Sequence, residues 1–370
     1  MGGHSCFEEY KPGVAMVAVQ CIYAAMSLSA KAAFTEGMTP MVFVVYRQAI
    51  ATLVLLPATI LTKGGRLSDM AVGTRGFALV FVTSLIGGTL NQFLYYQGLH
   101  LASSSVATAM VNLTPAVTFV MAASVGLEKV NLRSLRSMAK VIGTIICVGG
   151  AISMAFFKGP KLLNADYHKL ITLLHSVTDK WIAGALFLIG SSFCWSLWLI
   201  LQVPLCKSYL DPLSLSAWMC LLSTFQSGIL TFFLLPDLSA WRITSLIELF
   251  ACIFAGIFGS CVTYCLQTWC VSKRGPLYSA MFNPLCTVIT TVSAFFVLHE
   301  ELHIGSLIGA IAVVGGLYVV LWGKAEDLNK IKPIPSDGRT KIAIIVDARH
   351  VSGESAVREP LIAEKAQVES

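Results

Sequence analysis

The chain has 370 residues, of which 56% are hydrophobic and only 12% are charged. Soluble proteins carry about a quarter charged residues, so this composition excludes an ordinary soluble globular domain. The formal net charge of +6 matters through its placement between apolar stretches, and we expect no nucleic-acid partner.

Ten windows of the chain are nearly free of charge, and each is long enough to cross ~30 Å of hydrocarbon as a helix. In chain order they cover residues 13–33, 40–62, 76–99, 103–126, 138–157, 182–202, 212–235, 245–271, 277–299 and 304–323. The first window lacks a small-residue cleavage site, so we expect it to be retained as a span. The sequence therefore predicts an all-α polytopic membrane protein with ten transmembrane helices in the lipid bilayer.

The positive residues between the windows predict the orientation, because lysine and arginine are enriched in cytoplasmic loops. With the N-terminus in the cytosol, the inner links include a cluster of positive residues that ends at Lys140. We predict that both termini are cytosolic. Residues 1–12 form the cytosolic N-terminus, and residues 324–370 form a disordered cytosolic tail.

The chain also repeats itself with a period of five windows. The segment "TAMVNLTPA" of the fourth window is similar to "SAMFNPL" of the ninth, and "GTIICVGGA" of the fifth is similar to "GAIAVVGGL" of the tenth. Because five is odd, the second copy must enter the membrane from the opposite side, as in transporters that work by alternating access. We predict two inverted five-helix repeats, at residues 13–157 and 181–323, joined by an extramembrane link at residues 158–180. The alternative is that the duplication built only a scaffold.

Each repeat carries a proline beside an asparagine in its fourth helix, Pro115 near Asn112 and Pro284 after Asn283. Proline leaves a carbonyl one turn earlier without its partner, which hydrocarbon does not tolerate unless protein, water or a ligand satisfies it. An amide beside a broken turn could hold a polar solute.

Polar stripes on the third and eighth windows predict an interior face. Asn91, Gln92 and Tyr96 lie on the third window, and Gln267 lies on the eighth beside Trp269, which could form a wall of the site. Close helix packing is the competing interpretation of each residue taken singly. For the set that converges from four helices we favour solute contact.

Arg47, in "FVVYRQAIA", is a cation well inside the second window. A central arginine costs ~2.5 to 3.5 kcal/mol, so we expect Arg47 to face the interior and to be paired. Its partner could be an acid at a helix end (Glu36, Glu300 or Glu301), polar groups of neighbouring helices, or the carboxylate of a transported solute. Structural or gating roles therefore remain alternatives to substrate binding.

Aligning Pro40 with Pro212 places Met219 where Arg47 would recur, so the charge breaks the symmetry of the repeats.

Hydrolase, zinc-protease and phosphate-loop motifs are missing from the sequence, and the eleven cysteines show neither a disulfide nor a zinc framework. We predict neither an enzyme nor a cofactor or metal.

The motifs "VYRQ", "NQFLYYQGL", "ATAMVNLTPAVTF", "QTWC", "RGPLYSAMFNPL" and "GSLIGAIAVVGGLYVVLWGKAE" resemble the EamA type of the drug/metabolite transporter superfamily. More narrowly, they resemble the plant UMAMIT or walls-are-thin-related (nodulin-like) proteins, over residues 11 to about 327. The resemblance implies site residues at the following motif positions: Arg47, Gln92, Asn112, Pro115, Gln267, Trp269, Pro276, Asn283 and Pro284.

The resemblance also implies facilitated transport of amino acids, bidirectional or as export, in the plasma membrane more than in the vacuolar membrane. A carrier of auxin or another small organic acid is the alternative within the same class. A non-transporting membrane receptor or scaffold is the alternative from a different class. The oligomeric state stays open.

Overall fold

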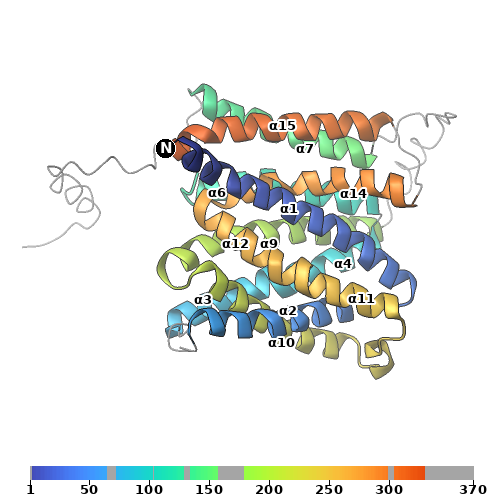
Figure 1. The fold of residues 1–370 in the computed structure, drawn as a ribbon. Coiled ribbons are helices and arrows are strands. Elements are labelled where there is room, and N and C mark those ends of the chain that lie inside the picture. Colours follow the sequence, from blue (N-terminus) through green and yellow to red (C-terminus); the bar gives the residue numbers. More distant parts are fainter. Residues whose placement is uncertain are drawn as a thin grey trace, which may run out of the picture. The chain divides into compact units, whose positions relative to one another are not determined.

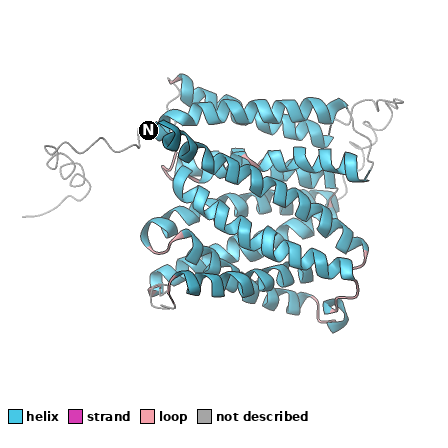
Figure 2. Cartoon of the chain, viewed as in Figure 1, coloured by secondary structure: helices cyan, strands magenta, loops and turns pink. Residues whose placement is uncertain are grey.

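In a computed structural model, the described residues are 2–64, 72–102, 104–128, 134–156, 179–298 and 304–329. Throughout these ranges the regular structure is helical and no strand occurs (Figure 2). The chain divides into a compact unit of Met1–Glu326 and a C-terminal unit of Asp327–Ser370. The helices of the first unit form the fold described below.

The helices follow the chain in the order shown in Figure 1. Their bounds are α1 Gly2–Thr35, α2 Pro40–Thr62, α3 Thr74–Ser84, η2 Leu85–Leu90, α4 Asn91–Leu101, α5 Ser104–Asn112, α6 Thr114–Ser124, α7 Leu135–Phe156, α9 Asp179–Ser208, α10 Pro212–Leu234, η3 Leu238–Trp241, α11 Leu246–Phe254, η4 Ala255–Val262, α12 Thr263–Arg274, α13 Pro276–Met281, α14 Asn283–Leu298 and α15 Ile304–Asn329.

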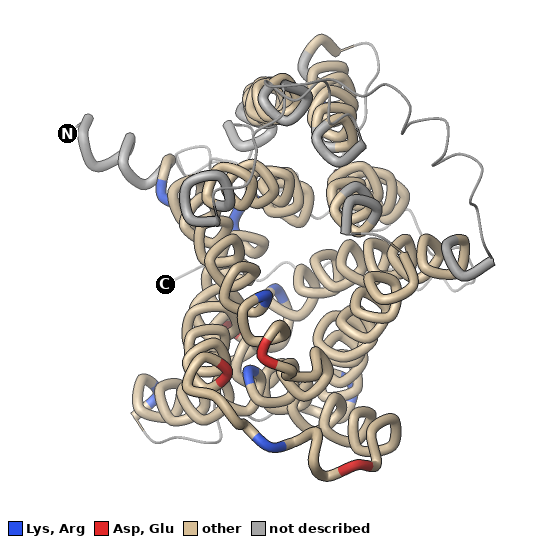
Figure 3. Tube along the Cα trace, turned by 90° about the vertical axis from the view of Figure 1, so that its right-hand side faces the viewer, with Lys and Arg blue, Asp and Glu red and all other residues tan. Residues whose placement is uncertain are grey.

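These helices overlap the predicted windows, but α1 begins at Gly2, within the predicted N-terminal segment, and α15 continues to Asn329, into the predicted tail. Within the described ranges, six helical stretches are long and apolar enough to cross a membrane, and shorter apolar helices cover Met110–Ser124, Ser137–Gly150 and Ile308–Gly323. Large apolar side chains point outward, including Leu53 at 74%, Phe233 at 77% and Leu246 at 83% exposure. Charged residues are sparse along the tube in Figure 3. An outer surface of this kind suits lipid and not water, so the chain is an all-α polytopic membrane protein.

Local sequence sets where several helices begin and end. Pro40 and Pro212 open α2 and α10, positions where a missing N–H costs no hydrogen bond. Asp211 caps α10 by accepting a hydrogen bond from Ser214 N at 3.2 Å. Gly275, with φ of 86°, ends α12 in a conformation that glycine adopts readily. The predicted breaks beside the two prolines are present, since α5 ends at Asn112 and α13 ends at Met281.

The first helix of each half of the chain packs against helices of the other half. Helix α1 packs against α11, α12 and α14, and its counterpart α9 packs against α4, α5 and α6. Helices α2 and α10 lie side by side, and Thr52 Oγ1 meets Thr224 Oγ1 at 3.1 Å (Figure 1). With Pro40 aligned to Pro212, these two threonines occupy the same position in the two halves.

Helices α7 and α15 approach each other through glycines. A side-chain carbon on Gly143 would lie 2.9 Å from the carbonyl oxygen of Gly316, and one on Gly150 would lie 2.9 Å from that of Gly309. The numbering runs in opposite directions along the two helices, so they are antiparallel. Gly143 corresponds to Gly309 in the repeat and Gly150 to Gly316, so each contact is the counterpart of the other.

Two features of the fold were not predicted. The third and eighth windows each contain a π-helical stretch, η2 and η4, where the sequence predicted continuous α-helix. Lys140, assigned to a cytosolic link, instead lies in α7, which begins at Leu135. Lys140 is buried, with its Nζ 3.7 Å from Oε2 of Glu128. Lys140 can lie in the buried part of the helix because the stem of lysine packs against apolar groups and its ammonium is paired.

Candidate substrate site

Arg47 lies on α2 and is only 4% exposed. Its Nη1 contacts Met26 Sδ on α1 at 3.6 Å, and its Nε has no hydrogen-bond partner among the described residues. Of the acids predicted as partners, Glu36 is exposed and forms no ion pair within the described part, while Glu300 and Glu301 lie outside it. The guanidinium is therefore buried without a carboxylate from the described chain.

Two glutamines beside Arg47 are each held by a tyrosine from the other half of the chain. Gln48 Nε2 donates to the hydroxyl of Tyr264 at 3.0 Å, and the Tyr23 hydroxyl donates to Gln267 Oε1 at 3.0 Å. Gln48 Oε1 and Gln267 Nε2 have no partner in the described structure. Each amide thus has one end fixed and the other end free for a ligand or water.

The charge of Arg47 reaches several hydroxyl groups of the interior. Its guanidinium lies within electrostatic range of the Tyr23, Tyr96 and Tyr264 side chains. Tyr96 also packs edge-on against Phe34, with ring centroids 6.0 Å apart. Residues from α1, α2, α4 and α12 therefore converge on one cation.

Aromatic rings close one side of this region. Tyr23 packs edge-on to Trp195 at 6.3 Å between centroids, Trp195 lies 4.9 Å from Trp198, and Trp198 lies 5.3 Å from Tyr264. Trp195 Nε1 is a buried donor with no partner in the described structure. We define the Arg47 cluster by its members: Tyr23, Arg47, Gln48, Trp195, Tyr264 and Gln267.

The π-helical stretch η4 presses against this cluster because it carries glycine. A side-chain carbon on Gly256 would lie 2.6 Å from Ile50 and 3.1 Å from the Arg47 carbonyl oxygen, and one on Gly259 would collide with Met26 Sδ. Widened π turns occur frequently at functional sites. Here the π turns bring the backbone of the eighth window next to Arg47.

The third window contributes its amides to helix packing. Asn91 Nδ2 donates to the Ser191 carbonyl oxygen at 2.7 Å and contacts Ser191 Oγ at 3.1 Å. Gln92 Nε2 donates to Asn91 Oδ1 at 3.3 Å. Of the three residues predicted on this window, only Tyr96 lies in reach of Arg47.

The broken fourth helix of the first half meets the second half through Asn112. The Thr287 hydroxyl on α14 donates to Asn112 Oδ1 at 2.9 Å, and Asn112 Nδ2 is buried without a partner in the described structure. Asn283 and Pro284, at the start of α14, are also buried. The Asn112–Thr287 hydrogen bond therefore joins the first break to the helix that carries Pro284.

Serines of α9 contact backbone carbonyls on both sides of the first break. Ser192 Oγ donates to the Met110 carbonyl oxygen at 2.7 Å, and Ser196 Oγ lies 3.4 Å from that of Thr114. Hydroxyl groups of α9 thus add polar contacts next to this break, where membrane helices require them.

A model of the EamA-like transporter family matches residues 11–156 and 182–322. The chain belongs to this family of membrane transporters. It is 48% identical to WAT1-related protein At4g30420 of Arabidopsis thaliana, over 85% of this chain and 86% of that protein. It is 36% identical to Protein WALLS ARE THIN 1 of the same plant, over 86% of this chain and 85% of that protein. It is therefore a WAT1-related member of the family.

A solved crystal structure of another protein supports the fold. It superposes with a TM-score of 0.66 at 16% sequence identity, covering 84% of this chain and 96% of that one. At this identity the likeness shows the fold alone.

Four members of the Arg47 cluster were not predicted from the sequence. Trp269 packs against an apolar cluster that includes Met16 and Leu277, and Trp195 packs against Tyr23. Gln48, Tyr23, Tyr264 and Trp195 were not among the predicted site residues. Gln48 directly follows Arg47, which was the available signal. The tyrosines form pairs more than 200 positions apart in sequence, which no local pattern shows.

Proposed function

We propose that this EamA-family transporter carries amino acids by facilitated, bidirectional or export transport, and that Arg47 binds the solute carboxylate. The supporting observation is that Arg47 is buried without a carboxylate partner from the described chain. A buried cation without an anion is costly, and a solute carboxylate would offset this cost whenever the site is loaded.

The second part of the proposal is alternating access between two inverted five-helix repeats. The family model matches the chain in two segments, 11–156 and 182–322. Thr52 meets its repeat counterpart Thr224, and the glycine contacts between α7 and α15 are reciprocal. Such self-complementary contacts are expected across a twofold axis. An axis that relates two antiparallel membrane helices runs perpendicular to them and thus along the membrane plane, which favours two similar conformations open to opposite sides.

The cluster also offers groups for the rest of an amino acid. Gln48 and Gln267 each keep one amide atom free, and Trp195 adds a donor. The aromatic faces of Tyr23, Trp195 and Tyr264 can hold an ammonium group by cation–π attraction. Asn112, with a free Nδ2, and Asn283 remain candidates for contact at the far edge.

A small organic acid such as auxin is the second candidate. The cluster contains a cation and aromatic rings but no acidic residue, which suits an aromatic carboxylate without an ammonium group. A receptor or scaffold would not need the free polar atoms that surround Arg47.

The test is flux in proteoliposomes loaded with labelled amino acids or auxin. Substituting Arg47→Gln should raise the apparent KM about ten- to a hundredfold, because a charge-assisted hydrogen bond contributes ~1.5 to 3 kcal/mol. Arg47→Lys should give an intermediate value because lysine keeps the charge but loses the planar fork. The matched control is Arg242→Gln, at an exposed arginine. An unchanged apparent affinity in Arg47→Gln would remove the carboxylate role, and flux of auxin without amino acids would select the second candidate.

We further propose the plasma membrane as the location, with both termini in the cytosol and extramembrane segments at residues 1–12, 158–180 and 324–370. A fluorescent fusion at the C-terminus tests this. If external protease removes the tag from intact cells, the C-terminus lies outside and the proposed orientation is wrong. If the fluorescence lies at the vacuolar membrane, the proposed location is wrong.

A further inference from the structure

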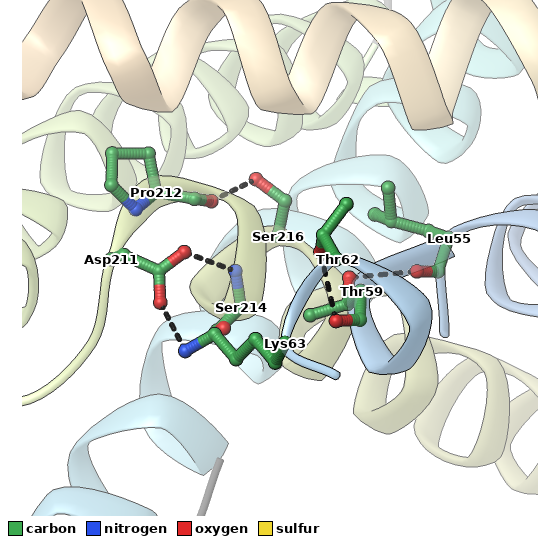
Figure 4. A network of polar contacts seen from close by, with 8 residues as sticks. All are labelled: Leu55, Thr59, Thr62, Lys63, Asp211, Pro212, Ser214 and Ser216. Carbon is green, nitrogen blue, oxygen red and sulfur yellow. Dashed lines mark hydrogen bonds and ion pairs between the residues drawn. The ribbon is translucent and has the colours of Figure 1, made fainter. Parts of the chain in front are cut away.

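We call the packing contact between α2 and α10 the α2–α10 joint. An ion pair links the two helices at one end of this joint. Lys63 Nζ lies 2.6 Å from Asp211 Oδ1, directly after the end of α2 and directly before the start of α10 (Figure 4). The two side chains are 20% and 44% exposed, so this end of the joint is reached by solvent.

At the opposite end of the same joint, no such pair occurs among the described residues. With Pro40 aligned to Pro212, Lys63 corresponds to Leu235 and Asp211 corresponds to Thr39. Neither counterpart carries a charge, and the Thr39 side chain forms no capping hydrogen bond. A joint that is symmetric at its centre, where Thr52 meets Thr224, is thus asymmetric in charge at its ends.

Polar residues of α10 and α12 lie along the way from the ion pair to the Arg47 cluster. Asp211 caps α10 through Ser214 N, and one turn into the helix Ser216 Oγ bonds to Thr268 Oγ1 at 3.3 Å. Thr268 directly follows Gln267 of the cluster. Polar side chains therefore lie between the cluster and the Lys63 end of the joint.

We propose that Lys63 and Asp211 form a one-sided latch that favours the conformation closed at this end, biasing which side the solute site faces. The inference rests on the alternating access proposed above. If the two conformations exchange the two ends of the α2–α10 joint, the ion pair is made in one of them only. A contact present in one conformation and missing from its mirror state shifts the equilibrium toward the first.

Two native cysteines report on the two ends. Cys265 lies beside Ser216, one turn into α10 from the Lys63 end, and between Tyr264 and Gln267 of the cluster along α12. Cys252 contacts Met38 Sδ at 3.7 Å, near the other end of α2. Alkylation of the full chain in lipid nanodiscs, read for each cysteine by peptide mass spectrometry, measures how often each position becomes accessible.

The variants separate the ion pair from the helix cap. Asp211→Asn removes the charge but keeps an oxygen that can cap α10, and Lys63→Gln removes the other charge. Each should raise the labelling rate of Cys265 about two- to fivefold, the range expected for a partly exposed ion pair, without raising that of Cys252. Adding Asp211→Asn to Lys63→Gln should raise Cys265 labelling no further, because the contact between the two side chains is already lost.

The control is Asp237→Asn, at an exposed aspartate beyond the other end of α10, which should leave Cys265 unchanged. Unchanged labelling in both single variants, an equal rise at both cysteines, or additive effects in the double variant would each overturn the latch. Labelling requires no solute. If labelling changes as predicted but the chain transports no amino acid, the latch is supported and the proposed solute is wrong. If flux is normal and labelling is unchanged, only the latch is wrong.

Discussion

Helices α2 and α10 match in length, start and packing, but differ in the charge of one buried residue. Both have 23 residues, both begin at proline, and they pack on each other at equivalent threonines. Yet Arg47 on α2 is a buried cation, while its counterpart Met219 on α10 lies in an apolar core with Leu215 and Ala217. The comparison teaches that two helices with matching lengths, starts and contacts can differ in charge, because the buried cation occurs on α2 only.

The strongest test of this asymmetry makes α10 resemble α2. Met219→Arg would put a cation among buried apolar side chains with no acid beside it in the described core. An uncompensated buried charge costs about 3 to 5 kcal/mol, so we expect a large fall in the thermal midpoint and in the yield of folded protein. Met219→Leu, which conserves volume, should cost under about 1.5 kcal/mol. Equal midpoints for the two variants would show that position 219 has room and polarity for a charge, which contradicts the comparison.

The symmetric side of the comparison is tested at the joint between α7 and α15. A side-chain carbon on Gly316 would lie 2.6 Å from Cys147 N and 2.8 Å from the Gly143 carbonyl oxygen, and backbone atoms cannot rotate away. We expect Gly316→Ala to lower stability by about 1 to 3 kcal/mol. The neighbouring Gly315 has nothing within 4 Å, so Gly315→Ala should leave stability unchanged or slightly higher. Thermal unfolding in detergent measures both, and a loss in Gly315→Ala of the same size would rule out contact at the joint as the cause.

The sequence predicted those features of the fold that depend on neighbouring residues in the chain, and missed those that depend on contacts between distant segments. The breaks near Pro115 and Pro284 were predicted because proline acts on its own helix turn. The π stretches η2 and η4 were not, because they depend on how neighbouring helices press on glycines such as Gly256.

The residues of the site divide in the same way, into those that a local pattern could predict and those that it could not. Arg47 and Gln267 could be predicted, since a charge or an amide within an apolar stretch is visible in one segment. Their surroundings could not, because the Tyr23–Gln267 and Gln48–Tyr264 pairs join the two halves of the chain. Each pair joins residues more than 200 positions apart in sequence, so tertiary structure was needed to find the partners.

The smallest expected effect concerns the two aspartates that flank α10. Burial would by itself raise the pKa of Asp211, but hydrogen bonds from Lys63 and Ser214 and the lysine charge outweigh it and lower that pKa. Hydrogen bonds from Ser239 lower the pKa of Asp237, which is fully exposed. A lowered folded-state pKa means that the carboxylate stabilises the fold above its unfolded pKa of about 4, and that this stabilisation is lost as the pH falls through the folded value.

The stability difference between the wild-type chain and Asp211→Asn should therefore be constant from about pH 5 to pH 8 and shrink below about pH 4. A partly exposed ion pair contributes ~0.2 to 1 kcal/mol, so the difference will be small. Salt separates the two aspartates, since screening at about 1 M weakens the Lys63 pair but not the hydrogen bonds that Asp237 accepts within its own turn. Thermal midpoints across pH, at low and high salt, measure this. If the Asp211→Asn difference persists at high salt and at about pH 3, the carboxylate acts as a helix cap alone, and the two ends of α10 are less different than their charges suggest.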